Sequence, residues 1–395
     1  MMTIVAISVK VLLVLLSIPA AYLFISTIAA YFFRKKSGQA NRFLNIGVLI
    51  SAHNEEDGIQ QTIMNVRECD YPANRLDIFV IADNCSDQTA ERARHAGAVV
   101  AERTDPAHRG KGQALDWFLR HHRDMYHHTD VITIIDADVA PEKNYLIEIS
   151  QSLSQDNTKV VQAYNGVSNP EAGWRPALID AAFNVFNHLR MAGAVKLSGS
   201  SVLKGNGMAF RTELLEKYGW PCHSIVEDME FSLLLLQDGI TVDYNPDAVI
   251  RSEMVTSGKN ASSQRSRWEG GRFTLVRTMT VPLLRLFRTS LDPRYLFALA
   301  ELIIPPLSML VILFVLMTPP ALLLTDGLWM MLPGAWLAIL LLYVISGQIQ
   351  RRAPLRTWLV LAVSPIYILW KIPLYIAMAL GKKSSTWIRT SREKH

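Results

Sequence analysis

Cysteine is scarce in this chain of 395 residues, which contains only Cys69, Cys85 and Cys222. No pair has the CxxC spacing, so the sequence excludes a disulfide framework and the usual structural zinc sites. Three scattered cysteines instead favour reduced thiols in a cytosolic domain. The GxxxxGK[ST] and GxGxxG patterns are also missing, which excludes the P-loop and the dinucleotide-binding fingerprint.

Charged residues are few as well, at 19% of the chain, whereas hydrophobic residues make up 50%. The net charge is +5, and the excess basic residues form short clusters beside apolar segments. This distribution fits an anionic membrane surface better than a nucleic-acid stripe. We therefore expect a lipid bilayer as a partner, and no nucleic acid.

The first long apolar run, residues 11–33, contains no charged residue. A bilayer core needs about 20 apolar residues, so this run is long enough to cross one. Arg34, Lys35 and Lys36 follow it directly and mark the next segment as cytoplasmic. A cleaved signal peptide fits less well, because the run is too long and its basic residues lie on the wrong side. Residues 1–36 are predicted to be a transmembrane anchor.

Three further apolar stretches, residues 296–324, 328–349 and 358–380, precede a basic tail at 382–395. Three full crossings would leave the tail outside, yet its basic residues indicate the cytoplasmic side. The first stretch contains Glu301 and two proline pairs, and the third contains Lys371 and two prolines. Charges and prolines at membrane depth fit interrupted segments buried against protein. We predict that one of the two is broken, the third in preference, and that the tail is cytoplasmic.

The region between the apolar ends has the pattern of a doubly wound α/β sheet, because predicted strands alternate with amphipathic helices. The predicted strands are residues 46–52, 76–82, 99–101, 131–135 and 160–164. Helices are predicted over 57–68, 89–96, from 110 onward, over 176–189, over 225–236 and over 263–286. Beyond residue 150 the alternation becomes less regular.

Polar side chains follow several of these strands: Asn54 and Glu55, then Asp83, then Asp136 and Asp138. The carboxyl ends of parallel strands meet at one edge of a sheet, where such folds bind their ligands. If residues 136–138 are extended, both carboxylates point to the same side. Such a pair suits Mg²⁺ or Mn²⁺ that also bridges phosphate oxygens. An isolated Asp-x-Asp can equally be a solvated turn, but the neighbouring polar residues favour the metal.

Three later segments also have a possible chemical role. The loop at 110–112, Gly-Lys-Gly, lets amides and one ammonium approach an anion at a helix start. The glycines of 204–207 indicate that the backbone passes close to a ligand. Glu227 and Asp228 begin a helix, where acidic residues also simply suit the helix dipole. Residues 263–286 read as an amphipathic helix at the membrane interface.

Four short motifs occur in a fixed order between the apolar ends: Asp83, Asp136-x-Asp138, Glu227-Asp228, and Gln-x-x-Arg-Trp at 264–268. This combination resembles the membrane-integrated family 2 glycosyltransferases. That group includes the synthases of hyaluronan, cellulose, chitin oligosaccharides and poly-N-acetylglucosamine, and the ceramide glucosyltransferases. The resemblance covers residues 45–275 by motif and the flanking segments by layout.

The resemblance implies a GT-A fold, Rossmann-like α/β, that transfers a sugar with inversion from a nucleotide-sugar donor. By position in the motifs, Asn54, Glu55 and Asp83 would hold the nucleoside, and Lys111 would lie near the nucleotide or diphosphate. Arg267 would stabilise the departing diphosphate.

For catalysis, the resemblance makes Asp228 the general base, with Glu227 beside it. Asp138 would ligate Mg²⁺ or Mn²⁺, and Asp136 would lie beside the donor sugar or the metal. Trp268 and Gln264 would contact the acceptor. These roles match the chemistry, because inversion needs a carboxylate opposite the leaving group and the diphosphate needs positive charge.

Two departures from the family pattern are visible. The common Thr-Glu-Asp is Val-Glu-Asp here, at residues 226–228, which leaves the base unchanged. The membrane portion is smaller than in the cellulose and hyaluronan synthases. Secretion of a long polymer through a channel of this chain therefore stays open, as does an oligomer or an export partner.

The predicted organisation is an anchor at 1–36, a cytosolic GT-A domain at 43–258, an interface helix region at 259–290, a transmembrane region at 291–381 and a basic tail at 382–395. The predicted function is transfer of a UDP-hexose or UDP-N-acetylhexosamine sugar to a polysaccharide or lipid-linked acceptor. We place it at the cytoplasmic face of the cell membrane, in exopolysaccharide or capsule synthesis.

A single-step glycolipid transferase, like the ceramide glucosyltransferases, is the alternative within the enzyme class. A membrane transporter and an inactive scaffold are alternatives from other classes. The large α/β domain argues against the transporter, and the complete set of motif residues argues against the scaffold.

Overall fold

The computed structural model describes residues 2–36, 43–254, 256 and 258–379, with the backbone alone at 2, 258–270, 273, 374 and 377–379. Within these residues the chain forms two compact units. The α/β unit consists of residues 34–169 and 199–271, and the helical unit of residues 2–33, 170–198 and 272–379.

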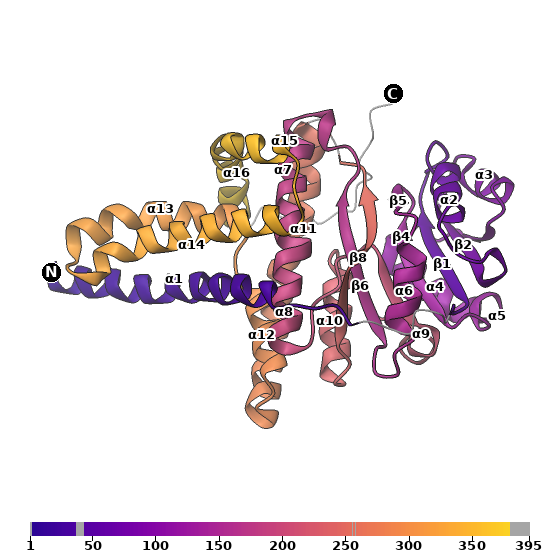
Figure 1. Ribbon diagram of the computed structural model, residues 1–395, viewed down its shortest axis with the longest axis horizontal. Helices are drawn as coiled ribbons and strands as arrows, with labels where there is room; N and C mark the ends of the chain where they lie inside the picture. The colour runs from indigo at the N-terminus through magenta and orange to yellow at the C-terminus, as the bar shows by residue number, and fades with distance from the viewer. Residues whose placement is uncertain (1, 37–42, 255, 257, 380–395) are drawn as a thin grey trace. The chain divides into compact units, whose positions relative to one another are not determined.

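The α/β unit is built on one sheet whose strand order, in the described residues, is β3-β2-β1-β4-β7-β6-β8-β5 (Figure 1). Strands β3, β2, β1 and β4 are parallel to one another, whereas β7 is antiparallel to both β4 and β6. The strands are β1 Ile46–Ala52, β2 Leu76–Asp83, β3 Val99–Arg103, β4 Val131–Asp136, β5 Val139–Pro141, β6 Val160–Val167, β7 Met208–Arg211 and β8 Val242–Ser252.

Side chains of alternate residues in the strands form two cores, one on each face of the sheet. Val48 and Ile50 of β1 belong to one core, with Ile59 and Ile63 of α2. Leu49 belongs to the other core. The helices of this unit are α2 Ile59–Arg67, α3 Thr89–His95, α4 Lys111–His121, α5 Arg123–Tyr126, α6 Tyr145–Leu153, α9 Thr212–Tyr218 and α10 Glu227–Gln237.

The predicted parallel pattern is confirmed from β1 to β4, where each predicted strand lies within one residue or two of its observed bounds. Beyond residue 150 the sheet is mixed, and β8 is not among the predicted strands. That strand contains Pro246, and its pairing with β6 shifts register between Ala163 and Tyr164. Proline reads as a strand breaker, but the Asn245 carboxamide accepts bonds from Asp247 and Ala248 and closes the bulge.

Lys35 and Lys36, interpreted from the sequence as part of a charge signal for the membrane, also form ion pairs within the α/β unit. The Lys35 ammonium lies 2.8 Å from Glu148 and 2.6 Å from Asp247. Lys36 lies 2.8 Å from Asp243. These partners come from α6 and β8, so the segment that enters the unit is fixed to two of its elements.

The helical unit contains, among the described residues, four stretches long and apolar enough to cross a membrane. They are Thr3–Tyr31, Leu307–Leu324, Leu328–Gln350 and Leu355–Pro373. The helices are α1 Met2–Tyr31, α7 Trp174–Phe183, α8 Arg190–Ser198, α12 Pro293–Ile303, α13 Leu307–Leu324, α14 Leu328–Gln350, α15 Leu355–Val360 and α16 Ser364–Ala379. Helix α11, Gly258–Ser290, is shared, because its residues up to 271 belong to the α/β unit and those from 272 to the helical unit. A π-helical segment, Asn184–Leu189, joins α7 to α8.

Helices α1, α13 and α14 pack side by side (Figure 1). Helix α1 begins well before residue 11, the predicted start of the first span, and therefore includes Lys10. The Lys10 ammonium lies 3.4 Å from Asp326, in the turn between α13 and α14. The N-terminal part of α1 and that turn therefore lie at the same end of the bundle.

Both C-terminal stretches in which the sequence predicted a break are interrupted. Residues 296–324 are divided between α12 and α13 at Ile304–Pro306, because Pro305 and Pro306 have no N–H to continue a helix. The described part of the third stretch, residues 358–379, passes through a 3₁₀ turn, Leu361–Val363, between α15 and α16. The prediction that one of the two stretches is broken, the third in preference, is therefore wrong in that the backbone changes in both. The basic tail lies outside the described residues, and its side of the membrane stays a prediction.

We expect the turn between α13 and α14 to face the outside of the cell, because the predicted anchor places its own start there. Asp326→Cys should react with a membrane-impermeant maleimide in intact cells, whereas Arg352→Cys, at the other end of α14, should react only after permeabilisation. The opposite pattern would invert the predicted topology.

Candidate active site

The polar residues predicted from the strand ends do meet at one edge of the sheet. Strand β1 lies between β2 and β4, with Ala52 opposite Ala82 and Ser51 opposite Asp136. The segments that follow these three strands are therefore neighbours, as expected for parallel strands.

Asn54 and Glu55 belong to a loop that is locked to the loop after β2. The Asn54 side-chain oxygen accepts a hydrogen bond from the Ser86 amide at 2.7 Å. The Glu55 amide donates to the Thr89 hydroxyl at 2.8 Å. Asn54 adopts a left-handed backbone with φ of 55°, which asparagine tolerates better than most residues. The two loops thus form a fixed surface at the predicted nucleoside position.

Asp83 is deeply buried and is paired with a residue that the sequence analysis missed. The Arg103 guanidinium, at the end of β3, lies 2.6 Å from the Asp83 carboxylate, and the two side chains are 5% and 7% exposed. The Asn84 side chain donates to the same oxygen at 2.9 Å. Arg103 ends β3 as Asp83 ends β2, and the two residues are opposite each other. This pairing could be predicted from the sequence only if β3 were already known to lie beside β2.

Lys111 connects the predicted phosphate loop to the Asp-x-Asp motif. Its ammonium lies 2.5 Å from both the Asp136 carboxylate and the Gly205 carbonyl oxygen. Burial disfavours the charged ammonium, but Asp136, Glu227 and Asp228 together outweigh this effect and raise the pKa of Lys111. The lysine is therefore charged at neutral pH and fixed at the first residue of α4.

The extended geometry assumed for residues 136–138 is wrong, because Ala137 and Asp138 form a turn. Strand β4 ends at Asp136, and β5 then pairs with β8 at the far edge of the sheet. The chain must change direction between these two strands, and it does so at Ala137 and Asp138. Asp136 and Asp138 still flank the carboxyl end of β4, both partly exposed.

Among the described residues, no group of three or more His, Cys, Asp and Glu side chains could hold a metal ion by itself. Mg²⁺ sites of nucleotide enzymes commonly use one or two carboxylates, with substrate phosphates and water as the other ligands. Asp136 and Asp138 fit that donor set. The Lys111 ammonium contacts Asp136 at the same edge.

Glu227 and Asp228 form the first turn of α10, as predicted. Burial, and then the adjacent Asp228 carboxylate, raise the pKa of Glu227 to about 8. Burial also raises the pKa of Asp228, against the opposing effects of the Met229 amide and the Lys204 ammonium. Near pH 7 Glu227 is largely protonated, so Asp228 can be ionised without a second buried negative charge beside it.

Asp228 lies against the loop that also contacts Lys111. A Cβ atom at Gly205 would lie 3.3 Å from the nearer Asp228 carboxylate oxygen. The structure therefore brings Lys111, Asp136 and Asp228 around the 204–207 loop. Gln264, Arg267 and Trp268 lie in α11, a helix of 33 residues, but their side chains lie outside the described residues.

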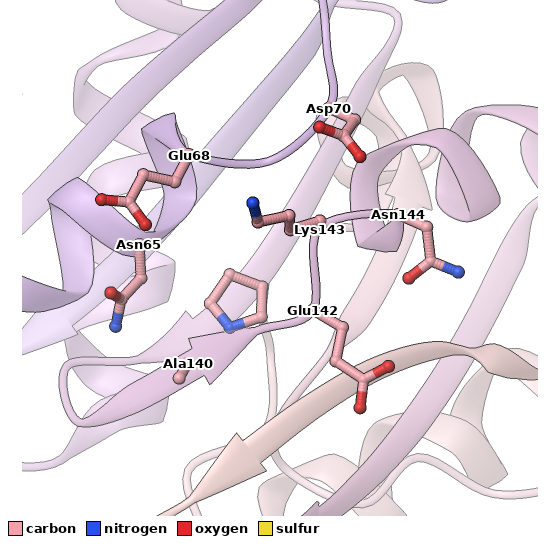
Figure 2. Close-up of a pocket in the computed structure, with 8 residues that line it drawn as sticks. Asn65, Glu68, Asp70, Ala140, Glu142, Lys143 and Asn144 are labelled. Carbon is pink, nitrogen blue, oxygen red and sulfur yellow. The ribbon is translucent and has the colours of Figure 1, made fainter.

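A separate surface hollow of about 540 Å³ contains none of the predicted site residues. Figure 2 shows its polar side chains, which come from the end of α2 and the segment after β5: Asn65, Glu68, Asp70, Glu142, Lys143 and Asn144. The candidate active site is thus defined by the strand ends and not by this hollow.

Residues 44–271 match the model of a protein family described as "Glycosyltransferase like family 2". The match covers more than half of the chain and contains every site residue discussed above. The chain belongs to this family.

Two curated relatives illustrate the similarity of this glycosyltransferase to known proteins. A Bacillus subtilis protein named "Probable glycosyltransferase YdaM" is 27% identical over 252 residues, which are 62% of this chain and 59% of that protein. The Beta-monoglucosyldiacylglycerol synthase of Trichormus variabilis is 26% identical over 236 residues, 57% of this chain and 48% of that protein. The matched region thus spans about half the length of these relatives.

Among solved structures, the mannosyltransferase PcManGT from Pyrobaculum calidifontis, in complex with GDP-Man and Mn²⁺, matches with a TM-score of 0.53. The alignment covers 89% of this chain and 99% of that chain, at 18% identity. This likeness confirms the predicted GT-A fold.

The raised pKa of Glu227 predicts a pH-dependent stability. Its folded pKa of about 8 exceeds that of an unfolded Glu, so the native state binds the extra proton and loses stability as pH rises toward 8. Without metal, Glu227→Gln should raise the melting temperature at pH 9 by about 2–8 °C, corresponding to roughly 1–2 kcal/mol, and change it little at pH 5.

The measurement is a thermal melt of the detergent-solubilised protein at both pH values in EDTA. Glu213→Gln is the matched control, because Glu213 is exposed and also lies in the first turn of its helix. Equal shifts for the two variants at pH 9 would contradict the assignment of Glu227 as a buried, protonated group.

Proposed function

We propose that this chain transfers a sugar, with inversion, from a UDP-hexose or UDP-N-acetylhexosamine to a hydroxyl group of a membrane-associated acceptor. The observation that carries the proposal is the arrangement around the 204–207 loop. Asp228 lies against Gly205, and the Gly205 carbonyl accepts from the lysine that contacts Asp136. Asp228, the proposed base, and Lys111, on the donor side, thus both contact the 204–207 loop.

The donor would bind along the ends of β1, β2 and β4. Asn54, Glu55 and Asp83 are proposed for the nucleoside, supported by their interlocked loops. Because Asp83 is held by Arg103, its carboxylate has a fixed orientation and can accept from a ring N–H. Lys111 is proposed near the diphosphate, and Arg267 is proposed to stabilise that group as it departs.

A divalent cation, Mg²⁺ or Mn²⁺, would be held by Asp138, with Asp136 beside it. When bound, it neutralises charge on the diphosphate and so makes it a better leaving group. The carboxylate donor set supports these hard ions. Lys111 contributes a second positive charge at the same edge.

In the transfer step, Asp228 accepts the proton of the acceptor hydroxyl as its oxygen attacks the anomeric carbon. The new carbon–oxygen bond forms opposite the bond to the diphosphate, which breaks and takes its electron pair, and the configuration inverts. A raised pKa makes Asp228 a stronger base than an ordinary carboxylate. Protonated Glu227 leaves the single negative charge to Asp228.

We propose an acceptor at the cytoplasmic face of the cell membrane, with Trp268 and Gln264 as its contacts. A polysaccharide or lipid-linked glycan, in exopolysaccharide or capsule synthesis, is the primary candidate, with an oligomer or export partner as possible additions. A membrane lipid is the second candidate, and the match to a glucosyldiacylglycerol synthase supports it. The four apolar stretches support a membrane site for either acceptor.

One assay separates the two acceptor classes. Membranes that contain the enzyme are incubated with a panel of radiolabelled UDP-sugars, and the products are partitioned between organic solvent and an ethanol-insoluble fraction. Label in organic solvent supports a glycolipid, and insoluble label supports a polymer. Absence of transfer from every donor would contradict the proposed UDP-sugar function.

Asp228→Asn should lower turnover by roughly two to four orders of magnitude, because the acceptor hydroxyl loses its base. The Kd for UDP should stay within about threefold, since UDP contains no acceptor. Asp238→Asn, at the other end of α10 and exposed, is the control and should be fully active. Turnover near the wild-type rate in Asp228→Asn would exclude Asp228 as the base.

Removal of the metal should abolish transfer, and Mg²⁺ or Mn²⁺ should restore it, while Ca²⁺ should be a poor substitute because it prefers more ligands at longer distances. Asp138→Asn should raise the Mn²⁺ concentration needed for half-maximal activity by about tenfold or more. Asp77→Asn, at the opposite end of β2, should leave it unchanged. Full activity in excess chelator would contradict a metal role for the Asp-x-Asp motif.

A further inference from the structure

The Lys204–Gly207 segment was noted in the sequence for its glycines, and the family motifs assign no role to Asn206 within it. Gly205 and Gly207 both have left-handed backbones, with φ of 78° and 67°, which glycine adopts without strain. Between them, the Asn206 side chain is turned into the protein and is 2% exposed. A buried carboxamide needs partners for both its oxygen and its nitrogen.

The Asn206 side-chain oxygen accepts a hydrogen bond from the Asp136 backbone amide at 3.1 Å. Pairing between β4 and β7 ends one step earlier, at Ile134 and Met208. The carboxamide therefore takes the place of a strand carbonyl as the acceptor for the last residue of β4. The Gly205 carbonyl, in the same loop, accepts a hydrogen bond from the Lys111 ammonium.

The other side of the carboxamide is anchored in a buried network. Its nitrogen donates to the Ser252 hydroxyl at 3.0 Å, and that hydroxyl donates to Asn165 at 2.9 Å. The Gln162 side chain, fully buried, donates to the Asn206 carbonyl at 2.7 Å and accepts from the Lys204 amide at 2.8 Å. Because every one of these groups has a partner, the loop has one well-defined shape.

We infer that Asn206 is a positioning residue for sugar transfer, and this inference rests on the function proposed above. Its hydrogen bond from the Asp136 amide holds Asp136 in a fixed position relative to the 204–207 loop. Asp228 packs against the same loop. A displacement of about 1 Å between reacting groups can cost about a hundredfold in rate. Asn206 acts through Asp136 and the loop, without contact with the substrate.

Asn206→Ala should lower kcat by about 10- to 100-fold while the Kd for UDP stays within about threefold, because the donor still binds but the carboxylates are misplaced. The exchange of the Asp136 amide with deuterium should become at least about tenfold faster, because its acceptor is gone. Asn206→Asp keeps an oxygen acceptor at the same place. Asn206→Asp should return the exchange rate of the Asp136 amide to within about threefold of the wild-type rate and recover part of the lost kcat.

Asn245→Ala is the matched control for the loss of a buried asparagine from the same sheet. Asn245 is 3% exposed and bonded to Glu148 and Ser152, away from the Asp-x-Asp motif. It should destabilise the enzyme to a similar degree, yet leave kcat and Asp136 exchange near wild type. Equal loss of kcat in the two alanine variants would reduce Asn206 to a structural residue and overturn the inference.

The exchange measurement needs no substrate and is made on the full chain in detergent. Unchanged Asp136 exchange in Asn206→Ala would overturn the inference even if the proposed donor were wrong. Conversely, a wild-type enzyme without transfer from any UDP-sugar, but with the predicted exchange pattern, would contradict the proposed function and leave the positioning role intact.

Discussion

The contact of Lys111 with Asp136 and the Gly205 carbonyl is the interaction on which the site depends. One ammonium at the start of α4 joins the end of β4 to the loop before β7. These segments are far apart in the sequence. The Asp136 carboxylate and the Gly205 carbonyl are both hydrogen-bond acceptors, so they need a donor such as the ammonium between them. A buried ammonium is costly unless it is paired and hydrogen-bonded, and here both partners belong to the candidate site. The lysine therefore fixes the geometry before any donor or metal binds.

Charge balance explains the rest of the arrangement. Two adjacent, partly buried carboxylates, Glu227 and Asp228, would be unfavourable if both were ionised. The raised pKa of Glu227, about 8, removes one of the two negative charges near pH 7. At the opposite side of the site, the Arg103 guanidinium pairs with the buried Asp83 carboxylate at 2.6 Å. Chemically similar side chains thus have different charge partners within one site.

The helical unit also contains a buried charge that is balanced by an ion pair. Arg190 of α8 lies 2.6 Å from Glu301 of α12, and both side chains are nearly inaccessible to solvent. The Tyr22 hydroxyl of α1 also contacts Glu301, and Arg272 of α11 donates to the carbonyls of Glu301 and Leu302. Four helices are therefore joined at Glu301, in the last turn of α12 before the proline break. An unpaired glutamate would be costly in such surroundings, so the partners account for its presence in an apolar stretch.

The sequence by itself determined the parallel half of the sheet, the polar residues at the ends of β1, β2 and β4, the start of α10 at Glu227 and the long helix α11. These features depend on residue periodicity and on local start and stop signals, which neighbouring residues carry. Only the tertiary structure decided that Arg103 pairs with Asp83, that Asn206 accepts from Asp136 and that residues 136–138 turn. It also decided that residues 170–198 group with the apolar helices. Each of these outcomes depends on which strands become neighbours, and an antiparallel β7 beside β4 cannot be read from local pattern. A buried polar side chain has many chemically equivalent partners along the sequence, and the strand order selects one of them.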